Sequence, residues 1–146
     1  MKPTVTVALT GASGMPYGLR LVEVLIRAGA RVYLLYSQAA HVVAKQEMDM
    51  VLPPRPSEAE REFGERFSAE RGQLRVFGRE DWFAPVASGS NAPDAMVICP
   101  CTVGTLAAVA AGASGKHIER GGAGKLKAGG KMILLAGGKP LSGLRP

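Results

Sequence analysis

The sequence is poor in aromatic residues and cysteine, and it has no long apolar run. Phe, Trp and Tyr make up 5% of the 146 residues, so a core must be built mainly from aliphatic side chains and methionine. The two cysteines, Cys99 and Cys101, are too few and too close together for a disulfide framework or a four-ligand zinc site. Two reduced, buried thiols and no bound metal are therefore expected.

Two targeting signals are also missing from the sequence. No apolar stretch reaches the ~18–20 residues that a membrane-spanning helix needs. The first residues lead directly into a strand-like segment, without a signal-peptide core and cleavage site. A cytoplasmic protein without a membrane span is expected.

Acidic residues are almost absent from the last third of the chain. Residues 95–146 contain seven Lys or Arg and one acid, Glu119, which accounts for the whole net charge of +6. Such a basic region can face nucleic acid, a membrane surface or a phosphorylated small molecule. Because the sequence has no nucleic-acid motif and no interleaved aromatics, phosphorylated ligands are favoured over nucleic acid.

Apolar runs alternate with helical patterns along the chain. Strands are predicted at Thr4–Thr10, Arg31–Tyr36, Leu74–Phe77, Ala95–Cys99 and Lys131–Ala136. Helices are predicted from Pro16 to about Gly29, from Gln38 to Glu47, from a capping box at Ser57 and Glu60 to about Arg71, and from Thr102 to about Ala111. This order predicts a single α/β domain over residues 1–146, with a three-layer, doubly wound parallel sheet of the flavodoxin or Rossmann type.

A glycine-rich turn, Gly11–Gly14, follows the first predicted strand. Glycines let the backbone approach a ligand, and the helix N-terminus that follows favours an anion. The dinucleotide fingerprint is not met, and the end of the second strand carries Ser37 instead of an acid, which argues against NAD. Ser37 suits a phosphate or a polar flavin edge, and it can equally be only a helix N-cap.

The segment Cys99–Thr105 repeats the order of strand, small-residue turn and helix N-terminus. Two such turns on neighbouring parallel strands form a crevice at the carboxyl ends, where ligands bind in this fold class. Thr102 and Thr105 can donate hydrogen bonds to a ligand there or simply cap a helix. A small polar loop, Ala87–Asn91, precedes this second turn.

Taken in order, these segments resemble the UbiX-type flavin prenyltransferases. The resemblance runs from the first strand to Ser142. The segments that carry it are Thr10–Gly14, Tyr17–Arg20, Ser37 with Ala39 and Ala40, Glu47 with Asp49, Phe77 with Asp81 and Trp82, Ala87–Ser90, Met96–Leu106 and Ile118–Arg120.

The resemblance implies an activity. FMN would be the substrate and dimethylallyl monophosphate the co-substrate, with the prenyl group joined to N5 and C6 of reduced FMN. The prenylated FMN would pass to a UbiD-type decarboxylase. No metal is implied, and a homo-oligomer that shares its sites between subunits is expected.

The resemblance also implies which residues hold FMN. These residues are Gly11, Ala12, Ser13, Ser37, Thr102, Val103, Gly104 and Thr105. Ser13 is expected on the N5 side of the flavin, whereas Ser37 and the 102–105 segment are expected to hold the ribityl phosphate. Glu47 is expected to act in proton transfer.

A second set is expected to bind the prenyl substrate. Its members are Trp82, Ser88, Gly89, Ser90, Arg120 and Lys127. The Trp82 ring can stabilise cationic character in the prenyl group. Arg120 and Lys127 would hold the phosphate and stabilise it as leaving group. Ser13, Glu47 and Lys127 are therefore the expected catalytic residues.

The sequence departs from the family pattern near its end. The family has Pro-Arg-Glu before the motif that is Pro140-Leu141-Ser142 here, so Gly137 replaces an arginine that binds FMN phosphate and Gly138 replaces a catalytic glutamate. The family chain also continues further, so the resemblance implies a shortened C-terminal part and an activity that can be impaired.

Two alternatives remain open besides an intact prenyltransferase. One is a non-catalytic or impaired FMN-binding relative, which the loss of the Arg-Glu pair favours. The other is a flavin-dependent cysteine decarboxylase of the same superfamily. That class uses a catalytic histidine and a Pro-x-Met-Asn segment, and neither His41 nor His117 lies in such a context.

Overall fold

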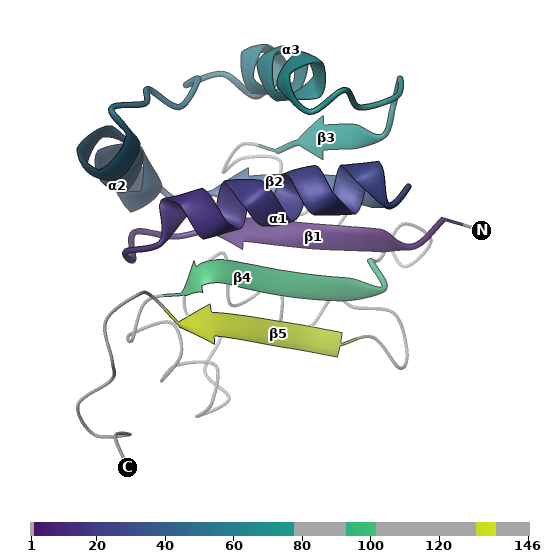
Figure 1. The fold of residues 1–146 in the computed structure, drawn as a ribbon, viewed down its shortest axis with the longest axis horizontal. Coiled ribbons are helices and arrows are strands. Elements are labelled where there is room, and N and C mark those ends of the chain that lie inside the picture. Colours follow the sequence, from purple (N-terminus) through teal and green to yellow (C-terminus); the bar gives the residue numbers. More distant parts are fainter. Residues whose placement is uncertain (1, 78–92, 102–130, 137–146) are drawn as a thin grey trace.

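The computed structural model of the protein describes residues 2–77, 93–101 and 131–136. In these ranges five strands form one parallel sheet (Figure 1). The strands are β1 (Thr4–Leu9), β2 (Arg31–Tyr36), β3 (Leu74–Val76), β4 (Ala95–Cys101) and β5 (Lys131–Ala136). Their spatial order is β3-β2-β1-β4-β5, so the direction of winding reverses between β1 and β4. The predicted doubly wound parallel sheet is confirmed.

The register aligns the apolar positions of neighbouring strands. Val7 of β1 pairs with Leu34 of β2 and with Val97 of β4. Because side chains alternate between the two faces of a strand, these partners point to the same face of the sheet. Continuous apolar strands of this kind are typical of a parallel sheet that is covered on both faces.

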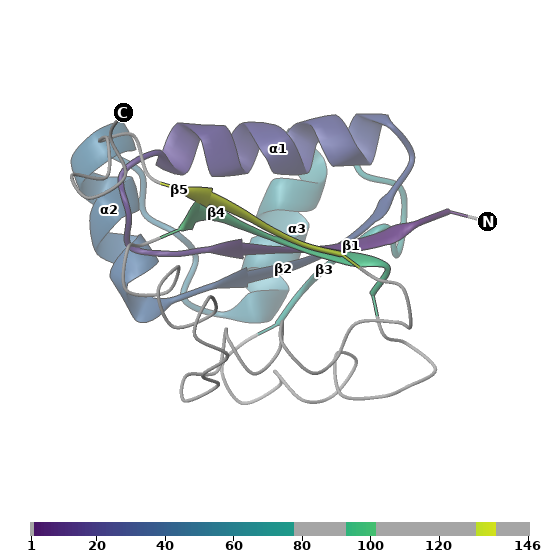
Figure 2. The same cartoon turned by 90° about the horizontal axis from the view of Figure 1, so that it is seen from below.

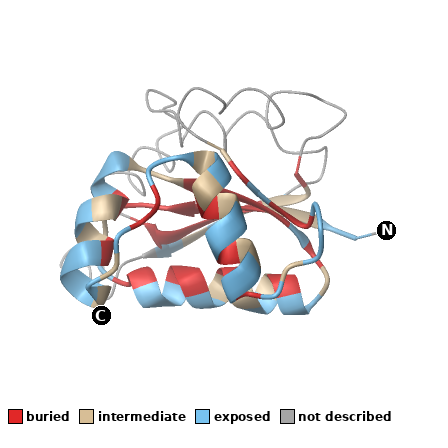
Figure 3. Cartoon of the chain, turned by 90° about the horizontal axis from the view of Figure 1, so that it is seen from above, coloured by how far each residue is buried: buried red, intermediate tan, exposed pale blue. Residues whose placement is uncertain are grey.

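The structure describes three helices, of which the first follows β1 and the other two follow β2. They are α1 (Met15–Arg27), α2 (Gln38–Met48) and α3 (Pro56–Arg66). Figure 2 shows α1 lying along one face of the sheet, and Figure 3 shows that it buries one side and exposes the other. The buried stripe of α1 contains Leu19, Val22 and Ile26, as the sequence predicts. The helix expected from Thr102 to Ala111 lies outside the described residues.

The prediction for α3 is wrong at both ends. The helix begins at Pro56 with Arg55 as N-cap, and no side chain caps it, so Ser57 lies within the first turn. The Glu60 carboxylate is directed to β3 instead of back to the helix start: it accepts from the Val76 amide at 3.4 Å and pairs with Arg75 at 3.7 Å.

The end of α3, unlike its start, has a local cause. The helix stops at Arg66, short of the predicted Arg71, and Ser68 takes a left-handed conformation with φ 57°. A non-glycine residue in this region gives no sequence signal comparable to a terminal glycine.

The core lies on both faces of the sheet. On the α1 face, aliphatic side chains of β1, β2 and β3 pack with all three helices, and the stacked rings of Phe63 and Phe67 add aromatic area. On the opposite face a smaller cluster contains Ala8, Leu35, Met96, Ile98 and Cys101.

The predicted state of the cysteines is confirmed. Both Cys99 and Cys101 are free thiols and both are buried. Burial raises the pKa of the Cys99 thiol, which lowers the fraction of reactive thiolate at neutral pH.

Two negative findings apply to the described ranges. No helix there has the length and apolar character needed to cross a membrane. No three His, Cys, Asp or Glu side chains of those ranges gather in a way that could hold a metal ion.

Candidate functional site

The carboxyl ends of β1, β2 and β4 meet at one edge of the sheet (Figure 1). Because β1 leads to β2 on one side while β4 lies on the other, this edge is the switch point of the winding. Open parallel sheets bind ligands at such a point, outside the carboxyl ends of the strands. The turn Gly11–Gly14 and Ser37 both lie there, directly after β1 and β2.

The turn after β1 packs closely against the first turn of α2. A Cβ atom added at Gly11 would lie 2.5 Å from the Cβ of Ala39, so no larger residue fits without a shift. Gly14 has φ 115°, a backbone conformation that residues with a side chain rarely adopt. The Ser13 side chain is exposed, and Ala12 is partly so. The turn therefore offers backbone and one hydroxyl to a ligand, with no bulky side chain in the way.

Glu47 reaches this turn from α2. Its carboxylate accepts from the Gly14 amide at 3.1 Å and from the Met15 amide at 2.9 Å. The start of α1 has no capping side chain of its own, so a carboxylate 32 residues away in the sequence takes that place. Sequence reasoning predicted a role for Glu47 but not this contact, which has no local signal. Its role in proton transfer stays a prediction.

Ser37 is the N-cap of α2. Its Oγ accepts from the Ala40 amide at 3.3 Å, and its backbone is extended. The capping interpretation is therefore confirmed. A hydroxyl that accepts one bond still has its proton to donate, so the predicted contact with a ligand phosphate is compatible with the cap and stays a prediction.

The end of β4 is fixed against the start of α1. A Cβ atom added at Gly18 would lie 2.4 Å from the Cys99 carbonyl oxygen and 2.6 Å from the Leu9 Cδ2 atom. The buried Thr10 hydroxyl also donates to the Pro100 carbonyl. The sequence places Thr10 in the motif that follows β1 but predicts no role for it.

Tyr36, the last residue of β2, is a further residue that sequence reasoning left unused. Its hydroxyl donates to the Pro53 carbonyl, and its ring meets that of His41 edge to face at 5.3 Å. Burial, with added repulsion from Glu62 and Glu58, raises the pKa of Tyr36 to about 12. The phenol is therefore neutral at physiological pH, and His41 has a packing role beside it.

The structure brings Gly11, Ala12, Ser13, Ser37 and Glu47 to one edge of the sheet. The other predicted site residues lie outside the described residues: Trp82, Ser88, Gly89, Ser90, Thr102, Val103, Gly104, Thr105, Arg120 and Lys127, as well as Gly137 and Gly138. Their roles stay predictions.

The fold and its glycine-rich turn define an α/β protein of the doubly wound class, whose members bind ligands at the switch point of a parallel sheet. The family model described as Flavoprotein matches residues 1–143. The chain therefore belongs to the flavoprotein family, and its relatives include UbiX flavin prenyltransferases.

Three of these relatives are informative. The chain is 46% identical over 140 residues to the flavin prenyltransferase UbiX of Pseudomonas aeruginosa, covering 96% of this chain and 67% of that one. AnUbiX (PadA1), solved in complex with FMN and dimethylallyl pyrophosphate, superimposes with a TM-score of 0.73 at 30% identity, covering 97% and 68% of the two chains.

The third relative is the dodecameric FMN-dependent UbiX-like decarboxylase from Escherichia coli O157:H7. It has a TM-score of 0.70 at 27% identity, with 94% of this chain and 68% of that one covered. The chain thus spans about two thirds of the length of the relatives it matches.

Proposed function

We propose that residues 1–146 form one FMN-binding domain that transfers a dimethylallyl group from dimethylallyl monophosphate to N5 and C6 of reduced FMN. The observation that carries the proposal is the 46% identity to a flavin prenyltransferase over 96% of the chain. The carbon–oxygen bond to the phosphate breaks as the N5–carbon bond forms, and N5 loses its proton. The C6–carbon bond forms with the electrons of the prenyl double bond, so the other carbon of that double bond gains a proton and C6 loses one. The product is prenylated FMN, which we expect a UbiD-type decarboxylase to use.

The described residues are compatible with FMN at the carboxyl edge of the sheet. The turn Gly11–Ser13 carries only small side chains, so its backbone can approach a planar ring closely. The Ser37 hydroxyl accepts from the Ala40 amide and can also donate its proton to the phosphate of FMN. Glu47, held by two backbone amides beside this turn, is a carboxylate within the same region. We assign it to proton transfer.

The prenyl phosphate would be held by basic residues of the last third of the chain. Arg120 and Lys127 belong to the segment that carries the whole net charge of +6. Cations beside the departing phosphate stabilise the charge that develops as the bond breaks. Trp82, with Ser88, Gly89 and Ser90, would line the prenyl pocket, and Thr102, Val103, Gly104 and Thr105 would join Ser37 at the FMN phosphate.

An anaerobic reaction tests this function. The protein is incubated with reduced FMN and dimethylallyl monophosphate, and the molecular mass of the released flavin is measured by mass spectrometry. A gain of one C5 prenyl unit supports the prenyltransferase. Flavin that binds and is recovered unmodified supports a non-catalytic FMN-binding relative instead. If the protein neither binds FMN nor forms product, both the prenyltransferase and the FMN-binding assignments are overturned.

The non-catalytic alternative has an observation in its favour. Gly137 and Gly138 stand where the resemblance places an arginine and a glutamate, and glycine can neither bind a phosphate through a side chain nor transfer a proton. Replacing Gly137 by Arg and Gly138 by Glu together should raise turnover if only this pair is missing. Unchanged turnover in the double variant would leave the non-catalytic assignment standing.

We also propose that the protein acts in the cytoplasm as a homo-oligomer, since a related UbiX-like decarboxylase is dodecameric. Light scattering of the purified chain tests the assembly. A mass that is a multiple of the single-chain mass supports it, and a single-chain mass contradicts it.

A further inference from the structure

The end of β1 is bonded to the ends of both neighbouring strands. On one side, the Leu9 carbonyl accepts from the Ser37 amide at 3.0 Å. On the other side, the Thr10 hydroxyl donates to the Pro100 carbonyl. Two consecutive residues therefore connect the turn after β1 to the turn after β2 and to the end of β4.

The Thr10 bond lies where regular pairing between β1 and β4 has ended. The last aligned pair of the two strands is Ala8 with Ile98. Pro100 has no amide hydrogen to offer a neighbour, and the pairing of β4 with β5 is irregular between Ile98 and Cys101. Beyond the Ala8–Ile98 pair, a side chain thus replaces the backbone hydrogen bond between the strands.

Both ends of this bond are out of contact with water. Thr10 is 3% exposed and Pro100 is buried. A buried carbonyl that loses its donor keeps the full cost of its desolvation. The bond therefore holds the end of β4 at a fixed separation from the turn Gly11–Gly14.

We propose that Thr10 is a positioning residue for FMN: its hydroxyl sets the spacing between the turn after β1 and the end of β4. The inference rests on the proposed function, since it assumes that FMN binds against the turn Gly11–Gly14. Thr10 acts through the Pro100 backbone and not by touching the flavin.

Thr6 provides a matched control on the same strand. It is 1% exposed, and its hydroxyl has no hydrogen-bond partner in the part of the chain that the structure describes. Thr6→Val and Thr10→Val make the same isosteric change four residues apart. Among the contacts of the described residues, only the second change removes a hydrogen bond.

The experiment compares Thr10→Val, Thr10→Ser and Thr6→Val with the wild type. FMN affinity is measured by quenching of flavin fluorescence, with the folded fraction of each variant determined separately. We expect Thr10→Val to bind FMN about tenfold more weakly, whereas Thr10→Ser and Thr6→Val stay within about twofold of the wild type.

A second readout excludes a merely structural effect. At saturating FMN, the visible circular dichroism spectrum of the bound flavin reports the orientation of the flavin in its site. The shape of this spectrum does not depend on the fraction of the protein that is folded. We expect a changed spectrum for Thr10→Val and the wild-type spectrum for Thr10→Ser and Thr6→Val. If Thr10→Val does not fold, Thr10→Cys under reducing conditions replaces it, since a thiol is a weak donor. We expect Thr10→Cys to bind FMN more weakly than Thr10→Ser does.

The outcomes separate this inference from the function on which it rests. FMN binding by the wild type with the same affinity and spectrum in Thr10→Val, or in Thr10→Cys where that variant replaces it, overturns the positioning role and leaves the proposed function intact. Equal weakening in Thr6→Val also overturns it, because the effect would then belong to the strand and not to the bond. A wild type that does not bind FMN overturns both.

Discussion

Two glycines that both lie within helices have opposite surroundings. A Cβ atom at Gly18 of α1 would lie 2.4 Å from the Cys99 carbonyl, whereas one at Gly64 of α3 would meet nothing within 4 Å. Gly18→Ala should therefore cost about 1–3 kcal/mol of unfolding free energy through overpacking. Gly64→Ala should gain up to about 1 kcal/mol from helix propensity.

Urea unfolding of the two variants checks this contrast. Since both substitutions are glycine to alanine in a helix, the propensity gain is common to them and only the contact differs. Equal stabilisation by both would mean that α1 does not approach β4 as closely as the structure has it.

A second residue-scale prediction concerns pH and Tyr36. Burial raises its pKa from 10.0 to about 12, so the folded state holds the phenolic proton more tightly than the unfolded state does. The resulting stability is fully present below pH 10.0 and is lost as the pH rises towards about 12. Tyr36→Phe lacks both the titration and the hydrogen bond to Pro53.

The measurement is the difference in unfolding free energy between wild type and Tyr36→Phe over alkaline pH. Lysines and other tyrosines titrate in both proteins and cancel in the difference. The wild type should be the more stable protein at neutral pH, by about 1 kcal/mol, and this advantage should shrink above pH 10.0. A constant difference would show that Tyr36 is not buried as described.

At the scale of elements, Glu47 couples the end of α2 to the start of α1. Glu47→Gln keeps an oxygen that can accept from the Gly14 and Met15 amides but removes the charge. The interaction of that charge with the helix N-terminus contributes about 0.3–1 kcal/mol, so a small loss of stability is expected, and one that diminishes in high salt. Turnover should fall far more, by about 10²–10⁴-fold, if Glu47 transfers a proton.

Asp49→Asn is the control for this variant. Asp49 ends the same helix, its side chain is 87% exposed, and it pairs only with Lys45 among the contacts described for it. It should leave turnover unchanged. A loss of turnover in Glu47→Gln no greater than its loss of stability would assign Glu47 to the cap alone.

For the whole molecule, the sequence predicts what depends on pattern and misses what depends on contacts distant in the chain. The apolar runs are sufficient to predict all five described strands, and β-turn-α-β order is sufficient for their parallel pairing. The start of α3 was missed because Glu60 turns to β3, a contact 16 residues away. The Glu47 cap and the Thr10–Pro100 bond were missed for the same reason.

The turns of the candidate site could be predicted from the sequence only in part. Gly11–Gly14 and Ser37 could be placed at the carboxyl edge from strand order alone, since parallel strands share that edge. The sequence leaves two interpretations of Ser37 open, a helix cap or a ligand contact, and the structure identifies the Ala40 amide as the partner of the cap.

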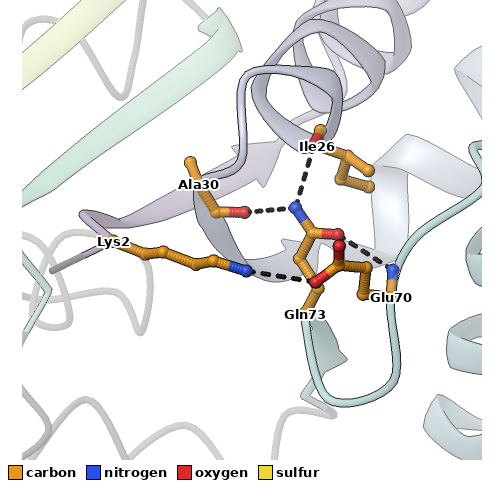
Figure 4. Close-up of polar contacts among 5 residues, drawn as sticks. All are labelled: Lys2, Ile26, Ala30, Glu70 and Gln73. Atoms are coloured by element: carbon orange, nitrogen blue, oxygen red, sulfur yellow. Dashed lines mark hydrogen bonds and ion pairs between the residues drawn. The ribbon is translucent and has the colours of Figure 1, made fainter.

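The opposite end of the sheet is fixed by Gln73, another residue without a sequence signal. Its side-chain amide donates to the Ile26 carbonyl at 2.9 Å and to the Ala30 carbonyl at 2.8 Å, and its oxygen accepts from the Glu70 amide at 2.9 Å (Figure 4). Gln73 is 7% exposed, so water cannot replace these bonds. It joins the end of α1 to the turn that enters β3.

Gln73→Met keeps the side-chain volume but removes these bonds, and we expect it to cost about 2–3 kcal/mol of unfolding free energy. Because Gln73 lies at the amino end of the sheet and the candidate site at the carboxyl end, FMN affinity per folded molecule should not change. Lys2→Met is the control: the Lys2–Glu70 pair is exposed, at 57% and 75%, and should contribute less than about 1 kcal/mol. Weaker FMN binding by folded Gln73→Met would show that the two ends of the sheet are coupled.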